Sequence, residues 1–260
     1  MTGLDFKNKV ALITGGGTGI GKAVAAAILA GGGKVVINGR REEVLRETAA
    51  ELDPGGANLA TVAGSIADKR VAQAMADTAI ARFGGIHILI NNAGIFKPTP
   101  FLDHQPEDVD AYLDIILKGS FYAAQAAVPA MIKGGGGSIV NVGSMWAEQA
   151  IGATPSSAYS AAKAGVHALT RNLAIEFAAQ GIRVNTVAPA VVETPVYNTF
   201  LSEEQVKEVL PGFNSFHPLG RNGQPQDVAS LILFLASGQA SWITGTVIPV
   251  DGGVLSGRHN

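Results

Sequence analysis

Residues 9–30, KVALITGGGTGIGKAVAAAILA, decide the fold of this chain. The run at 9–14 is almost entirely apolar, as expected of a parallel strand buried on both faces. The stretch from Ile20 to Ala30 has the length and composition of a helix, and the glycine-rich turn from Thr14 to Gly21 joins the two. This order is the first half of a β-α-β unit, so the chain is predicted to begin a parallel sheet.

The same alternation continues to the end of the chain. Further strands are expected at 34–38, 59–63, 86–91, 137–142, 182–188 and 245–250, and further helices at 68–83, 108–133 and 158–180. No linker or change of composition divides the sequence. We therefore predict a single α/β domain over residues 1–260, a doubly wound parallel sheet of seven strands with helices on both faces.

Two irregular segments, 95–106 and 190–223, each follow a predicted strand. Both would lie at the carboxyl edge of the sheet, where ligands of such folds bind. Ordinary surface loops are the simpler alternative. Their length and their proline and aromatic content favour a pocket rim, with about 190–223 as a substrate loop or lid.

Composition excludes several classes of function. The net charge of -2 gives no phosphate-backbone footprint, so nucleic acid is not an expected partner. The chain has no cysteine, the N-terminus lacks the apolar core of a signal peptide, and no membrane partner is expected. We therefore expect a cytoplasmic protein that acts on a small molecule. No metal site is expected either, because the histidines are scattered at His87, His104, His167, His217 and His259.

The glycine-rich turn has the spacing G-x-x-x-G-x-G, with Gly15, Gly19 and Gly21. Glycines let backbone N–H groups approach a pyrophosphate at the positive end of the following helix. A purely structural turn is an equal alternative for the bare motif, and only its position between strand and helix favours a nucleotide. The turn lacks the G-K-[ST] ending of a Walker loop, which argues against nucleotide triphosphate hydrolysis.

The tip of the second predicted strand indicates which dinucleotide would bind. An acidic residue there would bind a ribose 2′-OH and mark NAD, but the chain has Gly39 followed by Arg40 and Arg41. A guanidinium pairs with a 2′-phosphate, so NADP(H) is preferred and NAD(H) is possible. The alternative is that both arginines are solvated beside Glu42 and Glu43.

Tyr159 and Lys163 in the segment SSAYSAAK are four residues apart on a predicted helix, so they share one face. A nearby ammonium stabilises a phenolate and should lower the pKa of Tyr159. The tyrosine then becomes a general acid for reducing a carbonyl and a base for oxidising an alcohol. Ser144, just after the fifth strand, could hold the substrate oxygen. Such Tyr–Lys pairs also arise by chance, but the surrounding small residues allow close approach of a ligand.

With these motifs the chain resembles the short-chain dehydrogenase/reductase family in its short form, over essentially all of its length. The segments that carry the resemblance are TGGGTGIG, NNAG, GSMW with AYSAAK, and IRVNTVAPAVVETP. It implies a Rossmann-like sheet, hydride transfer between a nicotinamide and a carbonyl or alcohol, catalysis by Ser144, Tyr159 and Lys163, and a homodimer or homotetramer. The cofactor residues expected from motif and resemblance are Gly15, Thr18, Gly19, Ile20, Gly21, Arg40, Arg41, Asn91, Ala93, Gly94, Tyr159, Lys163, Pro189, Val192 and Thr194.

Three positions and one spacing depart from the family pattern. Ile116 stands where an asparagine is usual, Ala190 replaces a glycine, and Ser65 replaces an aspartate. In the family the backbone carbonyl at the asparagine holds a water bonded to the lysine, so the proton relay is in question. Ser144 precedes Tyr159 by 15 positions, about two more than usual, so the intervening segment must bulge.

The pocket residues are less well defined by the sequence. Trp146, Gln149 and Tyr197 are the substrate contacts we expect, and the loops that carry them suit a medium-sized hydrophobic ketone. Other residues expected around the rim are Phe96, Glu148, Phe200, Phe213, Phe216 and His217. The leading hypothesis is an NADP(H)-dependent oxidoreductase for a ketone or secondary alcohol, such as a carbonyl or 3-oxoacyl reductase. The alternatives are an NAD(H)-dependent alcohol or sugar dehydrogenase, enoyl reduction, and a dinucleotide sensor with weakened catalysis.

Overall fold

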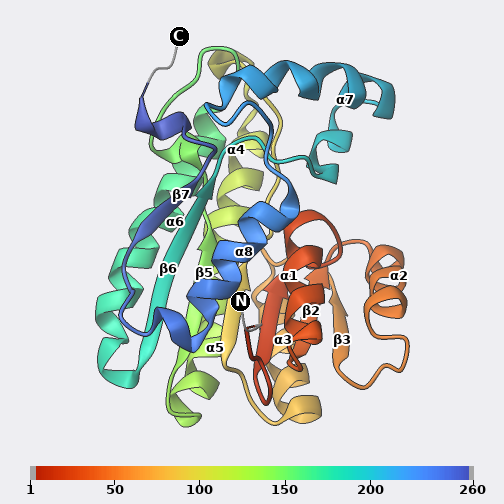
Figure 1. Cartoon of the computed structure of the whole chain (residues 1–260), viewed down its shortest axis with the longest axis vertical. Coiled ribbons are helices and arrows are strands. Elements are labelled where there is room, and N and C mark those ends of the chain that lie inside the picture. The colour runs from red at the N-terminus through yellow and green to blue at the C-terminus, as the bar shows by residue number, and fades with distance from the viewer. Residues whose placement is uncertain (1–3, 258–260) are drawn as a thin grey trace.

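One parallel sheet organises the chain in the computed structural model, which describes residues 4–257 (Figure 1). Its seven strands stand in the order β3-β2-β1-β4-β5-β6-β7, which confirms the predicted fold class. The strands are β1 (Val10–Thr14), β2 (Lys34–Gly39), β3 (Leu59–Ala63), β4 (Ile88–Asn91), β5 (Gly137–Val142), β6 (Ile182–Pro189) and β7 (Val247–Val250).

Helices cover both faces of the sheet because successive strand residues point to opposite sides. Ala11 and Ile13 pack with Val24 of α1 (Gly19–Ala30) and with residues of α2 (Glu42–Leu52) and α8 (Pro225–Ala236). Leu12 instead packs with Met75 of α3 (Lys69–Phe83) and with residues of α5 (Gly119–Lys133) and α6 (Ser157–Glu176). Both clusters are apolar, as expected where helices cover the two faces of a parallel sheet.

The order of the strands reverses at β1, which pairs with β2 on one side and with β4 on the other. Thr14 lies beside Asn91 in this register, so the ends of β1 and β4 are adjacent. Ligands of doubly wound sheets bind outside the carboxyl ends of the strands at such a reversal. The fold therefore places the glycine turn and the NNAG segment together at the expected binding edge.

The helix predicted at 108–133 is present but not uniform. α4 (Pro106–Tyr112) continues into a π-helical turn at Leu113–Lys118 and then into α5. The predicted helix at 158–180 ends as α6 at Glu176, and a 3₁₀ turn (Ala178–Gln180) follows it. π-helical turns occur often at functional sites, and here the turn packs against α6.

The stretch Pro106–Lys133 is long and apolar enough to cross a membrane by length and composition alone. In this fold 44% of its most apolar window is buried, and α5 packs against α3. Core packing therefore accounts for its composition, as it does in many core helices of globular domains.

The segment 190–223 lies over the carboxyl edge of the sheet, at the top of Figure 1. It contains α7 (Glu203–Val209) between two 3₁₀ turns, Pro195–Thr199 and Leu210–Phe216. Phe213 and Phe216 pack on Trp146 and Met145 beneath it. These contacts anchor the segment through apolar burial, as its aromatic content indicated.

A buried chain of polar side chains fixes α6 to the sheet. Asn91 Nδ2 donates to Asn141 Oδ1 at 2.9 Å, and Asn141 Nδ2 donates to Thr170 Oγ1 at 2.8 Å. Thr170 Oγ1 lies 2.6 Å from Thr186 Oγ1. The chain joins β4, β5, α6 and β6, and buried polar groups of this kind hold their partners in a defined arrangement.

Thr170→Val should lower the free energy of unfolding by about 1–3 kcal/mol, because the Asn141 amide and the Thr186 hydroxyl lose their partner while volume is nearly kept. Urea denaturation measures the change. Thr78→Val is the matched control, since the Thr78 hydroxyl bonds only to the Ala74 carbonyl of its own helix. Equal decreases in the free energy of unfolding of the two variants would show that the buried chain stabilises the fold no more than an ordinary hydrogen bond within a helix.

Candidate active site

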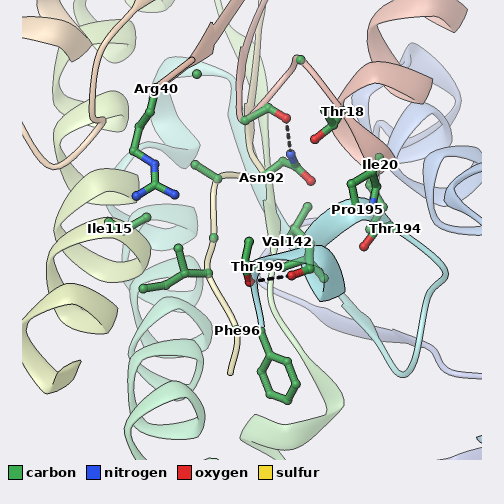
Figure 2. A pocket seen from close by; sticks show the side chains of 18 of the residues that line it. Thr18, Ile20, Arg40, Asn92, Phe96, Ile115, Val142, Thr194, Pro195 and Thr199 are labelled. Carbon is green, nitrogen blue, oxygen red and sulfur yellow. Dashed lines mark hydrogen bonds between the residues drawn. The ribbon is translucent and has the colours of Figure 1, made fainter. Parts of the chain in front are cut away.

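A cavity of about 300 Å³ opens at the carboxyl edge, between the glycine turn, the tips of β2, β4 and β5, and the segment after β6 (Figure 2). Most of the expected cofactor residues line it: Gly15, Thr18, Gly19, Ile20, Arg40, Arg41, Ala93, Gly94, Tyr159, Lys163, Pro189, Val192 and Thr194. Ala190 and Ser65, two of the departures from the family pattern, line it as well.

The glycine turn requires glycine for physical reasons. Gly15 and Gly19 have φ of +64° and +53°, where a side chain is strained. Gly21 does not line the cavity; a Cβ there would lie 2.4 Å from the Gly15 carbonyl oxygen, so its role is close packing. Thr18 begins α1 without a side-chain cap, which leaves N–H groups of the first turn facing the cavity. This geometry fits an anionic pyrophosphate.

The structure corrects the expected role of Asn91. Its side chain is buried beneath the cavity in the polar chain described above, because the last residue of β4 points into the sheet-helix core. Asn92, which the sequence analysis did not select, lines the cavity instead (Figure 2). Its Nδ2 donates to the carbonyls of Thr14 and Gly15 at 3.0 Å each, and it thereby holds the glycine turn. The doubled asparagine was the available signal, since adjacent side chains point in opposite directions at a strand end.

Arg40 reaches from the tip of β2 into the cavity, toward Ile115 (Figure 2). Within residues 4–257, neither Arg40 nor Arg41 forms an ion pair, and Glu43 pairs with Arg46 instead. Gly39 supplies no carboxylate at this end of the cavity. The guanidinium of Arg40 is therefore available to an anionic ligand.

Tyr159 and Lys163 lie side by side on α6, as their spacing predicted. The Lys163 Nζ is 5.7 Å from the centre of the Tyr159 ring and donates to the Val142 carbonyl at 2.6 Å. Lys163 is only 4% exposed, although it lines the cavity wall. Lys163 is therefore shielded from bulk water, whereas Tyr159 is partly exposed on the cavity wall.

Burial is the main influence on the pKa values of Tyr159 and Lys163. The sequence analysis expected a lowered pKa for Tyr159, and this expectation is wrong. Burial raises the pKa of Tyr159 to about 12, and a hydrogen bond with Ser144 only partly opposes this. Burial also lowers the pKa of Lys163 to about 8. Both shifts have one cause, since a dry site disfavours the phenolate and the ammonium alike. Tyr159 is thus a protonated phenol near neutral pH, which is the form that donates a proton.

Ser144 completes the constellation from the turn after β5. It is buried, its hydroxyl accepts a hydrogen bond from the Trp146 backbone N–H at 3.2 Å, and Ser144 is close enough to Tyr159 to oppose the rise in the pKa of the phenol. Tyr159 and Lys163 therefore stand on the cavity wall, and Ser144 lies buried behind it, between the lining residues Gly143 and Trp146.

The longer segment between Ser144 and Tyr159 bulges as expected, and Trp146 Nε1 donates to Thr154 Oγ1 at 2.9 Å across it. Trp146 and Tyr197 line the cavity, but Gln149 does not. Gln149 is exposed and borders a separate shallow hollow with Glu148 and Arg171, because the bulge turns outward after Trp146. The prediction that Gln149 contacts substrate is corrected on this ground.

Ile116 lies on the π-helical turn with its side chain buried among Tyr112, Ala162 and Val166. Its carbonyl accepts a hydrogen bond from the Ser120 hydroxyl at 2.6 Å. The backbone group of the family relay is therefore present, but it already has a protein partner, and Lys163 donates to Val142 instead.

Phe96 lies at the end of the cavity away from Arg40 (Figure 2), and other aromatic rings pack around it. Phe96 lies 5.0 Å from Tyr159, 6.1 Å from Phe200 and 6.2 Å from Trp146, measured between ring centres. His217, expected at the rim, borders another hollow near the end of β7. Among residues 4–257 no group of three or more His, Asp or Glu side chains is placed to hold a metal ion, and His259 lies outside the described residues.

Known proteins of this architecture match over nearly the whole chain. A family model described as "Enoyl-(Acyl carrier protein) reductase" matches residues 15–255. A cyclohexanol dehydrogenase from Acinetobacter sp. is 37% identical, with 96% of each chain covered, and a 3alpha-hydroxysteroid dehydrogenase from Mediterraneibacter gnavus is 38% identical, with 96% of this chain and 98% of the relative covered.

The structures agree with the sequences. A crystal structure of a short-chain type dehydrogenase/reductase from Mycobacterium marinum superimposes with a TM-score of 0.89 at 34% identity, with 96% of each chain covered. With the sheet order, the glycine turn and the Ser144–Tyr159–Lys163 corner, these matches show that the chain belongs to the short-chain dehydrogenase/reductase family and is an oxidoreductase of alcohols and carbonyl compounds.

Proposed function

We propose that the protein is an NADP(H)-dependent reductase of ketones, or the corresponding secondary-alcohol dehydrogenase. The grouping of Ser144, Tyr159 and Lys163 at one corner of the cavity carries this proposal, with Tyr159 and Lys163 on the wall and Ser144 buried beside it. The glycine turn and Arg40 lie elsewhere on the same cavity wall, which suits a long ligand that reaches from an anionic end to the reacting centre. The bound nicotinamide would supply the hydride in reduction and accept it in oxidation.

The chain's own residues would handle the substrate oxygen and its proton. The Ser144 hydroxyl would hold the carbonyl oxygen, and the Tyr159 phenol would donate its proton to that oxygen as negative charge develops. Lys163 remains largely charged at neutral pH with a pKa of about 8. Its ammonium would stabilise the phenolate left behind, while the Val142 carbonyl orients it.

Tyr159→Phe should lower kcat for ketone reduction by about 100- to 10,000-fold, because general acid catalysis contributes that much. The dissociation constant for NADPH, measured by fluorescence titration, should change by less than about threefold, within the range of a surface substitution. Tyr122→Phe on α5 is the matched control and should keep full activity. Full turnover by Tyr159→Phe would refute the catalytic assignment.

The preference for NADP(H) rests on the tip of β2. Arg40 points into the cavity without a carboxylate partner, and Gly39 stands where an acidic residue would bind a ribose 2′-OH. A guanidinium forms charge-assisted hydrogen bonds with phosphate, so a 2′-phosphate suits this end of the cavity better than a hydroxyl.

Arg40→Ala should weaken NADPH binding by about 10- to 100-fold, the equivalent of 1.5–3 kcal/mol for a charged hydrogen bond. NADH binding should change by less than about threefold, because NADH has no 2′-phosphate. Arg46→Ala on α2 controls for loss of a nearby positive charge, since Arg46 pairs with Glu43. Equal losses for both cofactors in Arg40→Ala would leave NAD(H) as the better assignment.

The substrate we propose is a medium-sized, uncharged, mainly hydrophobic ketone. Lys163, whose ammonium already donates to the Val142 carbonyl, is the only charged side chain on the aromatic part of the cavity wall among the described residues, so no further group there would neutralise a charged substrate. The cyclohexanol and hydroxysteroid dehydrogenases among the relatives are named for cyclic apolar alcohols. The relatives also include L-rhamnose dehydrogenases, so a sugar is the main alternative substrate.

Phe96→Ala should lower kcat/KM for cyclohexanone about tenfold and for acetone much less, since only the larger ketone fills the aromatic end. Phe101→Ala, at an exposed ring, is the control. An NADPH-consumption assay measures both. Turnover of L-rhamnose but of no ketone would overturn the proposed substrate class.

Two further readings are distinguishable. The description of the matched family model favours enoyl reduction, whereas the four-residue spacing of Tyr159 and Lys163 resembles that of the carbonyl reductases. Ile116 motivates a sensor with weakened catalysis, and tight NADPH binding without turnover of any ketone or enone would support it.

We also propose how the chain assembles and where it acts. The outward face of α6 exposes Ala161, Ala164, Ala168 and Ile175, which suits packing against a second copy in a homodimer or homotetramer. Residues 1–260 would form one catalytic domain, in which the segment 190–223 closes over the substrate. The place of action would be the cytoplasm.

A further inference from the structure

His167 lies one helical turn beyond Lys163 on α6 and is 2% exposed. The sequence alone favoured a core or interface histidine, and the structure places it in the core directly behind Ser144. A Cβ added to Gly143 would lie 2.2 Å from His167 Nε2, so the ring is packed flush against the backbone of Gly143 and Ser144. Only glycine fits next to this ring.

Two hydrogen bonds define the state of the imidazole. The Ser144 backbone N–H donates to His167 Nε2 at 3.4 Å, and His167 Nδ1 lies 2.8 Å from Glu148 Oε1. Since Nε2 accepts, Nδ1 carries the proton of the neutral ring and donates it to the Glu148 carboxylate. The ring therefore joins α6 and the bulged segment to the backbone of Ser144.

We propose that His167, held by Glu148, is a positioning residue that fixes the backbone of Ser144 and so aims the Ser144 hydroxyl at the substrate oxygen. This inference rests on the proposed carbonyl chemistry. The contact also reaches the pocket wall, because Trp146 N–H donates to the Ser144 hydroxyl and the Trp146 ring lines the cavity. A shift of this turn would move both the oxygen ligand and the aromatic wall, and small misplacements of reacting groups cost large factors in rate.

Protonation of His167 would break the arrangement. A second proton on Nε2 would face the Ser144 N–H, so two donors would meet. The charged groups that act on His167 are Glu148 from the bulged segment and Lys163 and Arg171 from α6. Burial lowers the pKa of His167 and outweighs the opposing effect of Glu148, which keeps the ring neutral above the ordinary histidine range.

The first test is activity with cyclohexanone and saturating NADPH. His167→Leu should lower kcat about 10- to 100-fold with little change in NADPH affinity, as expected when only a reacting group is misplaced. His167→Gln, whose carboxamide oxygen can accept from Ser144 N–H, should recover part of that loss.

Glu148→Gln should shift the acid limb of the plot of kcat against pH to lower pH, because the carboxylate that raises the pKa of His167 is removed. Gln149→Ala, an exposed neighbour of Glu148, should behave as wild type.

The second test does not depend on turnover. Long-range ¹H–¹⁵N NMR spectra of the full chain, compared with His167→Gln to assign the signal, should show the Nδ1–H tautomer of His167 from pH 6 to 9. The Ser144 amide signal should shift in His167→Leu. An Nε2–H tautomer, an unmoved Ser144 amide, or wild-type kcat in a folded His167→Leu protein would overturn the proposal. Absence of ketone turnover in the wild-type protein, with the expected NMR result, would refute only the proposed function.

Discussion

The hydrogen bond from Lys163 to the Val142 carbonyl joins α6 to the end of β5 at the floor of the cavity. A lysine this deeply buried needs a partner for its ammonium, and the last carbonyl of a parallel strand supplies one. The bond fixes where the tip of Lys163 lies. Because Tyr159 is one turn earlier on the same helix, it also fixes the position of the phenol. The geometry of the reacting corner follows from this one contact and from the polar chain through Asn141 and Thr170 that holds α6 down.

The burial of Lys163 is the second consequence of the same packing. The rings of Phe96 and Tyr112 pack against Tyr159, the end of β5 contacts Lys163, and burial disfavours the charged form of each. Electrostatic interactions strengthen where water is excluded. The Lys163 ammonium therefore stabilises a Tyr159 phenolate more strongly here than it would in water. The protonated phenol can donate the proton, and the largely charged Lys163 can stabilise the phenolate that remains after carbonyl reduction.

The two ends of the cavity suit different parts of the ligands, phosphate groups at one end and an apolar ring system at the other. The glycine turn and Arg40 present backbone N–H groups and a guanidinium, which suit phosphate. The opposite end presents aromatic rings, which suit an apolar ring system. The bulged segment after Ser144 contributes Trp146 to the wall and Glu148 to the support of His167, so the extra length of this segment serves both the wall and the catalytic turn.

Local pattern determined the strands, the long helices, the glycine turn and the Tyr159–Lys163 pair, because periodicity and close spacing are properties of neighbouring residues. Tertiary structure alone decided which asparagine faces the cavity, that Gln149 turns away, and that burial rather than the neighbouring ammonium controls the pKa of Tyr159. It also decided that His167 supports Ser144, 23 positions away. These features depend on side-chain direction at strand ends and on the exclusion of water. Both arise only when distant segments pack together, so no local pattern in the chain carries them.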